Sequence, residues 1–256
     1  MVQFKQSVGS LEINIEMVGY GPHIILCLPG ALGFIEADFG PLLEKFDPSK
    51  YTVIVWDPPG YGKSRPPHRD FSIGAEMYEK DADCAATLME NLGFNKYSLL
   101  GWNDGAATAC YIAACYPNAV NYLIIWGGRA EIKQEDLDRN KDFVNIDNIS
   151  KDVLEPHLIM YGEEYLRKSW TALNKMYEEI VRDGGYICFD MLEFIFCSTL
   201  VLHGENDTTI TLDNAQYFHE HIAFSEFIVV AGANHDLHLK FPDTFISKIE
   251  RFFEEN

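Results

Sequence analysis

One segment constrains the fold of this chain more than any other, the run KYSLLGWNDGAATACYIAACYP at residues 96–117. It predicts a short apolar strand, a glycine-rich turn and an alanine-rich helix that ends before Pro117. Glycines at 101 and 105 indicate that strand and helix approach too closely there for side chains. Asn103, at the centre of the turn, is therefore predicted to take a positive φ, which asparagine tolerates better than most residues.

The rest of the chain repeats this alternation of strand and helix. Residues 10–19 alternate apolar and polar side chains, and we expect them to form a hairpin with the apolar run at 21–30. Strands alternating with helices imply a mostly parallel sheet covered on both faces. We therefore predict an α/β fold with about eight strands. The remaining strands are expected within 51–57, 97–102, 118–128, 198–204 and 225–230, and helices within 37–47, 75–93, 214–222 and 241–256.

Residues 131–195 break the alternation. They are polar, highly charged and helical in pattern, as in the stretch KDVLEPHLIMYGEEYLRKSW. We expect this segment to be a helical cap over the carboxyl edge of the sheet, with residues 1–130 and 196–256 forming the core. A chain of 256 residues, 47% of them hydrophobic, can bury one large core of this kind.

Composition limits the partners and the compartment. The net charge of -19 argues against binding to nucleic acid or to anionic membranes. It has two interpretations, small ligands that carry an amino group or solubility alone. None of the six cysteines forms a C-x-x-C pair or has a histidine at zinc-ligand spacing, so no metal and no cofactor is predicted. The start of the chain lacks the pattern of a targeting segment. We expect a cytoplasmic protein, or a mitochondrial one if a presequence has been removed.

The turn at residues 101–105 has the context of a nucleophile elbow, in which G-x-S-x-G between a strand and a helix exposes a serine. Here Asn103 stands at the centre. In the α/β-hydrolase fold the acid and the histidine follow the nucleophile in that order. Asp207 follows the strand at 198–204, and His235 follows the last strand. Open α/β sheets place their sites at the carboxyl ends of strands, so we predict that these three residues meet there.

An oxyanion hole in such a site needs two backbone N–H groups. The sequence offers the N–H of Asp104, after the elbow centre, and that of Ala31 or Leu32 in the loop after the strand at 21–30. Asp57 follows another strand, and we expect it to hold its loop by hydrogen bonds. Structural or surface roles are predicted for His203, His219, His221 and His238. Since His203 and His238 flank the Asp207–His235 pair in sequence, a role in supporting that pair is the alternative for these two.

Several longer motifs are more specific than the fold pattern. They are DFGP, VWDPPGYGKSRPPHRDF, LLGWNDG, the strand end IWGG, LVLHGEND and HDLHLKF. On these motifs the chain resembles the biphenyl hydrolase-like family, the valacyclovir hydrolases, from about residue 11 to the C-terminal helix. The resemblance implies hydrolysis of α-amino-acid esters, with Asp207 and His235 as acid and base. It also implies that Asp104 pairs with the substrate's amino group.

Asn103 is the departure from that family, because an amide nitrogen delocalised into its carbonyl is a poor nucleophile. Three interpretations follow. The chain is an inactivated serine hydrolase, or a ligand-binding pseudoenzyme, or an enzyme that uses the His235–Asp207 dyad as a general base without an acyl-enzyme. Hydrolysis of the serine type is expected to be weak or absent in all three.

Overall fold

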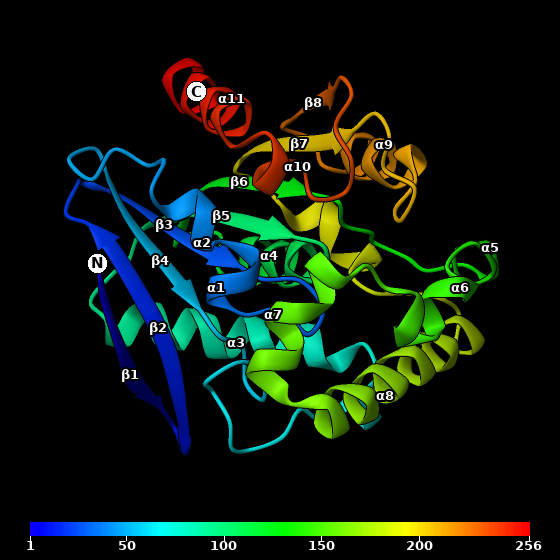
Figure 1. Ribbon diagram of the computed structural model, residues 1–256. Helices are drawn as coiled ribbons and strands as arrows, with labels where there is room; N and C mark the ends of the chain where they lie inside the picture. Colours follow the sequence, from blue (N-terminus) through cyan, green and yellow to red (C-terminus); the bar gives the residue numbers. More distant parts are fainter.

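The computed structural model of the protein describes residues 1–256, which form one eight-stranded sheet with helices on both sides (Figure 1). The strand order is β1-β2-β4-β3-β5-β6-β7-β8, with β1 and β2 antiparallel to their neighbours and all other pairs parallel. The predicted α/β fold with a mostly parallel sheet is thus confirmed. The strands are β1 Val2–Val8, β2 Leu11–Gly19, β3 His23–Leu28, β4 Tyr51–Trp56, β5 Tyr97–Trp102, β6 Val120–Trp126, β7 Ser198–Gly204 and β8 Ser225–Val230.

Helices occupy the connections between the strands. Those outside the β6–β7 connection are α1 Ile35–Asp38, α2 Gly40–Leu43, α3 Glu76–Asn91, α4 Asp104–Cys115, α9 Leu212–His221, α10 Leu237–Lys240 and α11 Pro242–Glu255, with a 3-10 turn, η1, at Phe71–Ile73. The β6–β7 connection contains α5 Gln134–Arg139, α6 Lys141–Val144, α7 Lys151–Tyr161 and α8 Glu163–Arg182, with 3-10 turns η2 Ile146–Asn148 and η3 Phe189–Phe194.

The continuous apolar runs of the central strands result from burial on both faces of the sheet. In β3, Leu26 and Leu28 point to a core shared with α3 and α4, whereas Ile25 and Cys27 point to a second core shared with α1, α2 and α11. All four side chains are at most 1% exposed. Side chains alternate between the faces of a strand, so a strand covered twice must be apolar at every position.

The expected hairpin of residues 10–19 with 21–30 is wrong. Strand β2 pairs instead with β1, in a hairpin closed at Val8 and Leu11, and with β4. Gly9 forms the tight turn between β1 and β2 with φ +58°. The half-buried β2 suits the antiparallel edge of the sheet, whereas the fully apolar β3 joins the parallel interior between β4 and β5.

The connection between β6 and β7 adds helices but no strand to the main sheet. Its only strand-like pairing is an isolated bridge between Glu131 and Tyr186. Figure 1 shows α5, α6 and α8 beyond the end of the sheet to which the arrows of β5 and β6 point. Because those arrowheads are the carboxyl ends, these helices lie near the edge where an α/β sheet carries its site.

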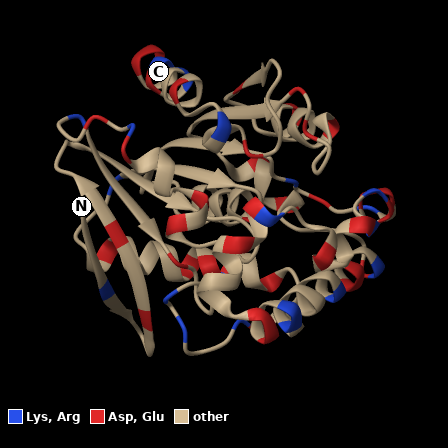
Figure 2. Cartoon of the chain, in the orientation of Figure 1, with Lys and Arg blue, Asp and Glu red and all other residues tan.

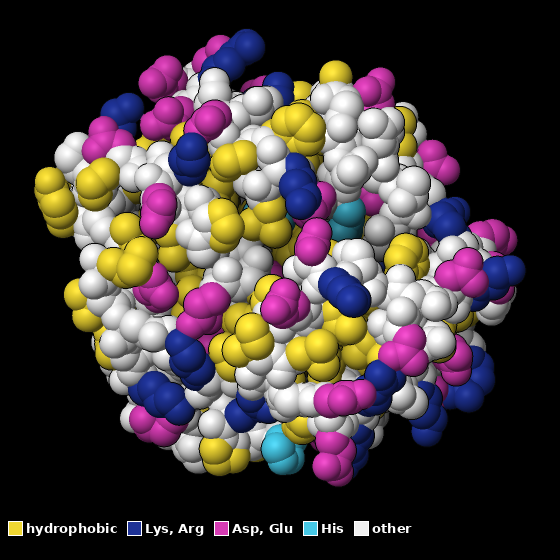
Figure 3. All heavy atoms as spheres, in the orientation of Figure 1, with side chains coloured by type: hydrophobic (Ala, Val, Ile, Leu, Met, Phe, Trp, Pro, Cys, Tyr) yellow, Lys and Arg dark blue, Asp and Glu magenta, His cyan; other side chains and the backbone are white.

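Charged side chains are spread over the molecule rather than collected on one element (Figure 2). The face seen in Figure 3 has acidic and basic side chains interspersed with hydrophobic ones. None of the helices has both the length and the apolar character required to cross a membrane.

Candidate active site

The turn between β5 and α4 has the geometry that its glycines predict. A Cβ on Gly105 would lie 2.1 Å from the carbonyl oxygen of Leu28, and one on Gly101 would lie 2.6 Å from that of Gly105. Asn103 caps α4 with φ 54° and ψ -121°, and Leu32 is the only other non-glycine residue with a positive φ. The backbone thereby turns the Asn103 side chain away from the sheet and toward the loops at its carboxyl edge.

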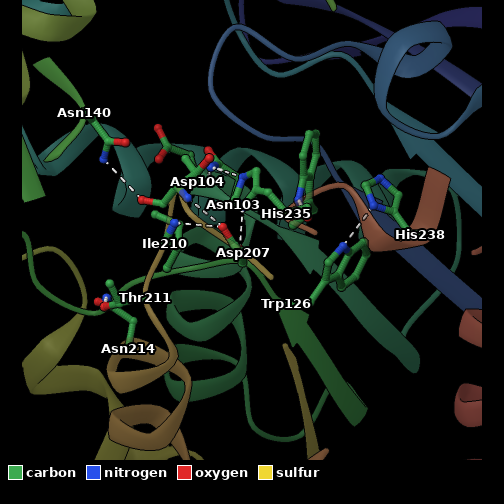
Figure 4. Close-up of polar contacts among 12 residues, drawn as sticks. Asn103, Asp104, Trp126, Asn140, Asp207, Ile210, Thr211, Asn214, His235 and His238 are labelled. Atoms are coloured by element: carbon green, nitrogen blue, oxygen red, sulfur yellow. Dashed lines mark hydrogen bonds and ion pairs between the residues drawn. The ribbon is translucent and has the colours of Figure 1, made fainter. Parts of the chain in front are cut away.

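Both ends of the Asn103 amide are hydrogen bonded (Figure 4). Its Oδ1 accepts the backbone N–H of Asp104 at 2.8 Å and that of Ala31 at 3.3 Å. Its Nδ2 lies 2.9 Å from Nε2 of His235. Two N–H donors at one end identify the amide oxygen there, so Nδ2–H donates to the imidazole at the other end.

His235 connects Asn103 to Asp207. Its Nδ1 lies 2.8 Å from Oδ2 of Asp207, whose side chain is 1% exposed. Oδ1 of Asp207 accepts the N–H groups of Thr209 and Ile210, both at 2.9 Å. Burial acts to raise the pKa of Asp207, but the hydrogen bond and charge of His235 and the N–H of Ile210 hold it below its usual value. The carboxylate therefore accepts the Nδ1 proton and leaves Nε2 as an acceptor.

The structure distinguishes the two candidates for the loop donor. The Ala31 N–H reaches the Asn103 amide oxygen, together with the Asp104 N–H. Leu32 does not; its carbonyl instead accepts the hydroxyl of Tyr161 on α7 at 2.8 Å. Gly30 lies under Asn103, where a Cβ would come within 3.0 Å of the Asn103 Cβ.

Asp38 supports this loop, a role that the sequence analysis missed. Its buried Oδ2 accepts the Gly30 N–H at 2.8 Å, and burial raises the pKa of Asp38 to about 7. His238 donates from Nε2 to the Asp38 carbonyl and accepts the Trp126 indole N–H at Nδ1. Burial lowers the pKa of His238 to about 3, so this ring is neutral and serves as a structural bridge. The DFGP motif was the only sequence signal at Asp38.

Asp104 is buried beneath α8. Both carboxylate oxygens accept the Tyr177 hydroxyl, at 3.0 and 2.9 Å. Burial raises the pKa of Asp104, and the charge of Arg129 and the hydrogen bond of Tyr177 oppose that rise. No sequence pattern indicated Tyr177 or Arg129, because they are 73 and 25 residues further along the chain.

A cavity of about 10 Å³ adjoins the Asp104 side chain. The hydroxyls of Tyr61 and Tyr78, which line it, are buried and form no hydrogen bond. Arg69 also lines it and is paired with Asp81, through Nη1 at 2.7 Å and Nη2 at 2.5 Å. The cavity is therefore about as large as one water molecule, and its mixed wall includes the Asp104 and Arg69 side chains.

The other predicted side chains have structural positions. Asp57 ties three segments together: its Oδ1 accepts the Ile35 N–H, and its Oδ2 accepts the Lys63 N–H and the Asn14 side-chain amide. His203 is buried, and burial lowers its pKa. His219 and His221 are exposed on α9.

Residues 23–183 match the family model described as the alpha/beta hydrolase fold. Over 253 residues the chain is 36% identical to the human serine hydrolase BPHL and 35% identical to the protein of that name from Mus musculus. Each alignment covers 98% of this chain and 86% of the relative. A solved serine hydrolase involved in carbazole degradation has a TM-score of 0.81 at 20% identity, with 100% of this chain and 99% of that chain covered. On this evidence of sequence and fold, the chain belongs to the α/β-hydrolase family.

Proposed function

We propose that this protein is a serine hydrolase homologue in which Asn103 occupies the nucleophile position, and that it hydrolyses esters slowly or not at all. The observation that carries the proposal is the hydrogen-bonded series Asp207–His235–Asn103, which ends on an amide nitrogen. In a serine hydrolase, the histidine at this place removes a proton from a hydroxyl that then attacks. The Asn103 side chain has no hydroxyl, and its nitrogen lone pair is delocalised.

The amide oxygen of Asn103 adds a second obstacle to turnover. It accepts the N–H groups of Ala31 and Asp104, which are the donors that we assign to the oxyanion hole. A substrate carbonyl must displace this oxygen before it can be polarised. Catalysis gains most from donors that are free to bind the charge of the transition state, and here they already have a partner.

The homology to serine hydrolases implies a small-molecule substrate, and we propose that it carries an amino group. Asp104 supports this, since its carboxylate adjoins a cavity of about 10 Å³, a volume suited to an ammonium group. The unpaired hydroxyls of Tyr61 and Tyr78 would accept its remaining protons. Residues 131–195 are proposed to act as the cap of this pocket, since Tyr177 on α8 covers Asp104.

One other function is favoured by a specific observation. The Nε2 atom of His235 is an acceptor, and the His235 side chain is 18% exposed. It could therefore deprotonate a water molecule or a substrate directly, with Asp207 balancing the charge. A ligand-binding protein without turnover would have the same pocket.

The deciding experiment compares the protein with Asn103→Ser on a panel of α-amino-acid esters. We expect kcat to rise by several orders of magnitude in Asn103→Ser, since the acid and the base are already in place. Rapid turnover by the Asn103 protein that His235→Ala abolishes would instead establish the general-base mechanism. No gain in a folded Asn103→Ser protein that still binds ligand would favour the binding protein.

A further inference from the structure

We propose that Asn103 is itself a substrate of this site, and that the protein slowly hydrolyses its own Asn103 side-chain amide to a carboxylate with release of ammonium. The inference rests on the proposed roles of His235 and Asp207. It goes beyond the proposed function by assigning a modification site and a reaction to the protein as it stands.

The Asn103 amide lies where its oxygen and its nitrogen each contact a group that can assist hydrolysis. Oδ1 accepts N–H groups from two separate segments, that of Asp104 at the start of α4 at 2.8 Å and that of Ala31 in the loop after β3 at 3.3 Å, and these polarise the carbonyl. Nδ2, the group that would leave, lies 2.9 Å from Nε2 of His235. An acyl oxygen between backbone donors and a leaving nitrogen against the histidine is the arrangement that a bound amide substrate requires.

The protons that this hydrolysis must move can all be accounted for by His235 and one water molecule. With Nδ1–H donated to Asp207, the lone pair at Nε2 of His235 accepts the Nδ2–H of Asn103, and it takes up a proton from water when that hydrogen bond is released. A water molecule adds to Cγ of Asn103 and gives a proton to Nε2, while the oxygen that gains negative charge keeps its two N–H partners. The Cγ–Nδ2 bond then breaks as Nε2 returns the proton to Nδ2. The amide and one water molecule give a carboxylate and an ammonium ion, and no other reactant is needed.

Solvent can reach the group that reacts. Asn103 is partly exposed, and the His235 side chain is 18% exposed, so water has access to the amide and to the base. Asn14 provides a contrast within the same chain. It is 3% exposed, and its Nδ2 donates to the Asp57 carboxylate at 2.8 Å, with no imidazole bonded to the amide. The two asparagines thus differ in the features that the reaction requires.

The test is incubation of the intact protein in water enriched in heavy oxygen, followed by peptide mass spectrometry. We expect heavy oxygen to enter the side chain at position 103, and the conversion to exceed that at Asn14 by about 10²-fold or more, the usual contribution of acid–base catalysis. His235→Gln and Asp207→Asn should reduce conversion at 103 to the level of Asn14. Denaturant should likewise reduce conversion at position 103 of the unchanged protein to the level of Asn14. This measurement does not depend on whether the variants fold.

Three results would overturn the inference. They are no conversion at Asn103 above Asn14, equal conversion in His235→Gln or in denaturant, and a product containing isoaspartate. Isoaspartate would indicate attack by the Asp104 backbone nitrogen instead of water. Ester turnover by Asn103→Ser separates this inference from the proposed function. If the Asn103→Ser variant is active and the Asn103 amide of the unchanged protein is stable, self-hydrolysis alone is refuted. If the unchanged protein converts Asn103 and the Asn103→Ser variant is inert, the serine-hydrolase origin of the site alone is refuted.

Discussion

Nε2 of His235 lies 2.9 Å from the amide nitrogen of Asn103, so the candidate base of this site faces a group that donates a hydrogen bond and has no hydroxyl. The same amide accepts the backbone N–H groups of Ala31 and Asp104 through its oxygen. Asn103 thereby hydrogen bonds both to the candidate base and to the two N–H groups assigned to the oxyanion hole. Its replacement is expected to change the chemistry more than the fold, because the turn itself depends on Gly101 and Gly105.

The first prediction concerns the acid. In the Asn103→Ser background, we expect Asp207→Asn to lower kcat by about 10⁴-fold on an α-amino-acid ester, since the wrong tautomer of His235 is then stabilised. Steady-state kinetics on both proteins measure the change. A loss of less than tenfold would mean that Asp207 does not orient His235. Asp152→Asn, at an exposed position on α7, should have no effect and serves as the control.

The second prediction concerns the amino group. Asp104→Asn should weaken binding of an amino ester to the Asn103 protein by about 1.5–3 kcal/mol, because a charge-assisted hydrogen bond is lost. Binding of the N-acetyl analogue, which has no ammonium, should change much less. Isothermal titration calorimetry with both ligands gives the comparison. Equal losses for the two ligands would show that Asp104 shapes the pocket without recognising charge.

The third prediction concerns the pH dependence of stability. Burial raises the pKa of Asp38 to about 7, so between the ordinary value of 3.8 and about 7 the folded state holds a proton that the unfolded state has lost. The contribution of Asp38 to the free energy of unfolding must therefore fall as pH rises through this window and level off above it. Asp38→Asn should remove that slope, whereas Asp152→Asn should keep it. Urea denaturation at a series of pH values measures both, and parallel curves for wild type and Asp38→Asn would contradict the prediction.

The fourth prediction concerns the elbow. Gly105→Ala should destabilise the protein by at least about 1–3 kcal/mol, since the added Cβ would meet the Leu28 carbonyl oxygen at 2.1 Å and the backbone has to move. Gly40→Ala is the matched control on α2, where an added Cβ meets no atom within 4 Å. The midpoint and slope of denaturant unfolding give the free energies for both variants. Equal stability of the two would mean that strand and helix can separate without cost at this turn.

Much of the fold was predictable because burial restricts which residue types can occupy each position of a strand or turn. A strand such as β3, covered on both faces, must be apolar at each position, and the close approach at Gly101 and Gly105 requires glycine whatever surrounds it. The positions of Asp207 and His235 were predictable because each follows an apolar segment whose pattern indicates a buried strand. The pairing of β2 was not, since alternation indicates a half-covered strand but not which neighbour it joins.

Residue patterns along the chain were sufficient to predict an α/β sheet with an asparagine at the elbow and an acid and a histidine at later strand ends. Three contacts depend on how distant segments pack: the amide oxygen of Asn103 accepts the Ala31 N–H, Asp38 supports that loop, and Tyr177 covers Asp104. Local patterns arise from periodic burial along one segment. Contacts between side chains of distant segments depend on how the whole sheet and its helices pack, and no single segment of the sequence contains that information.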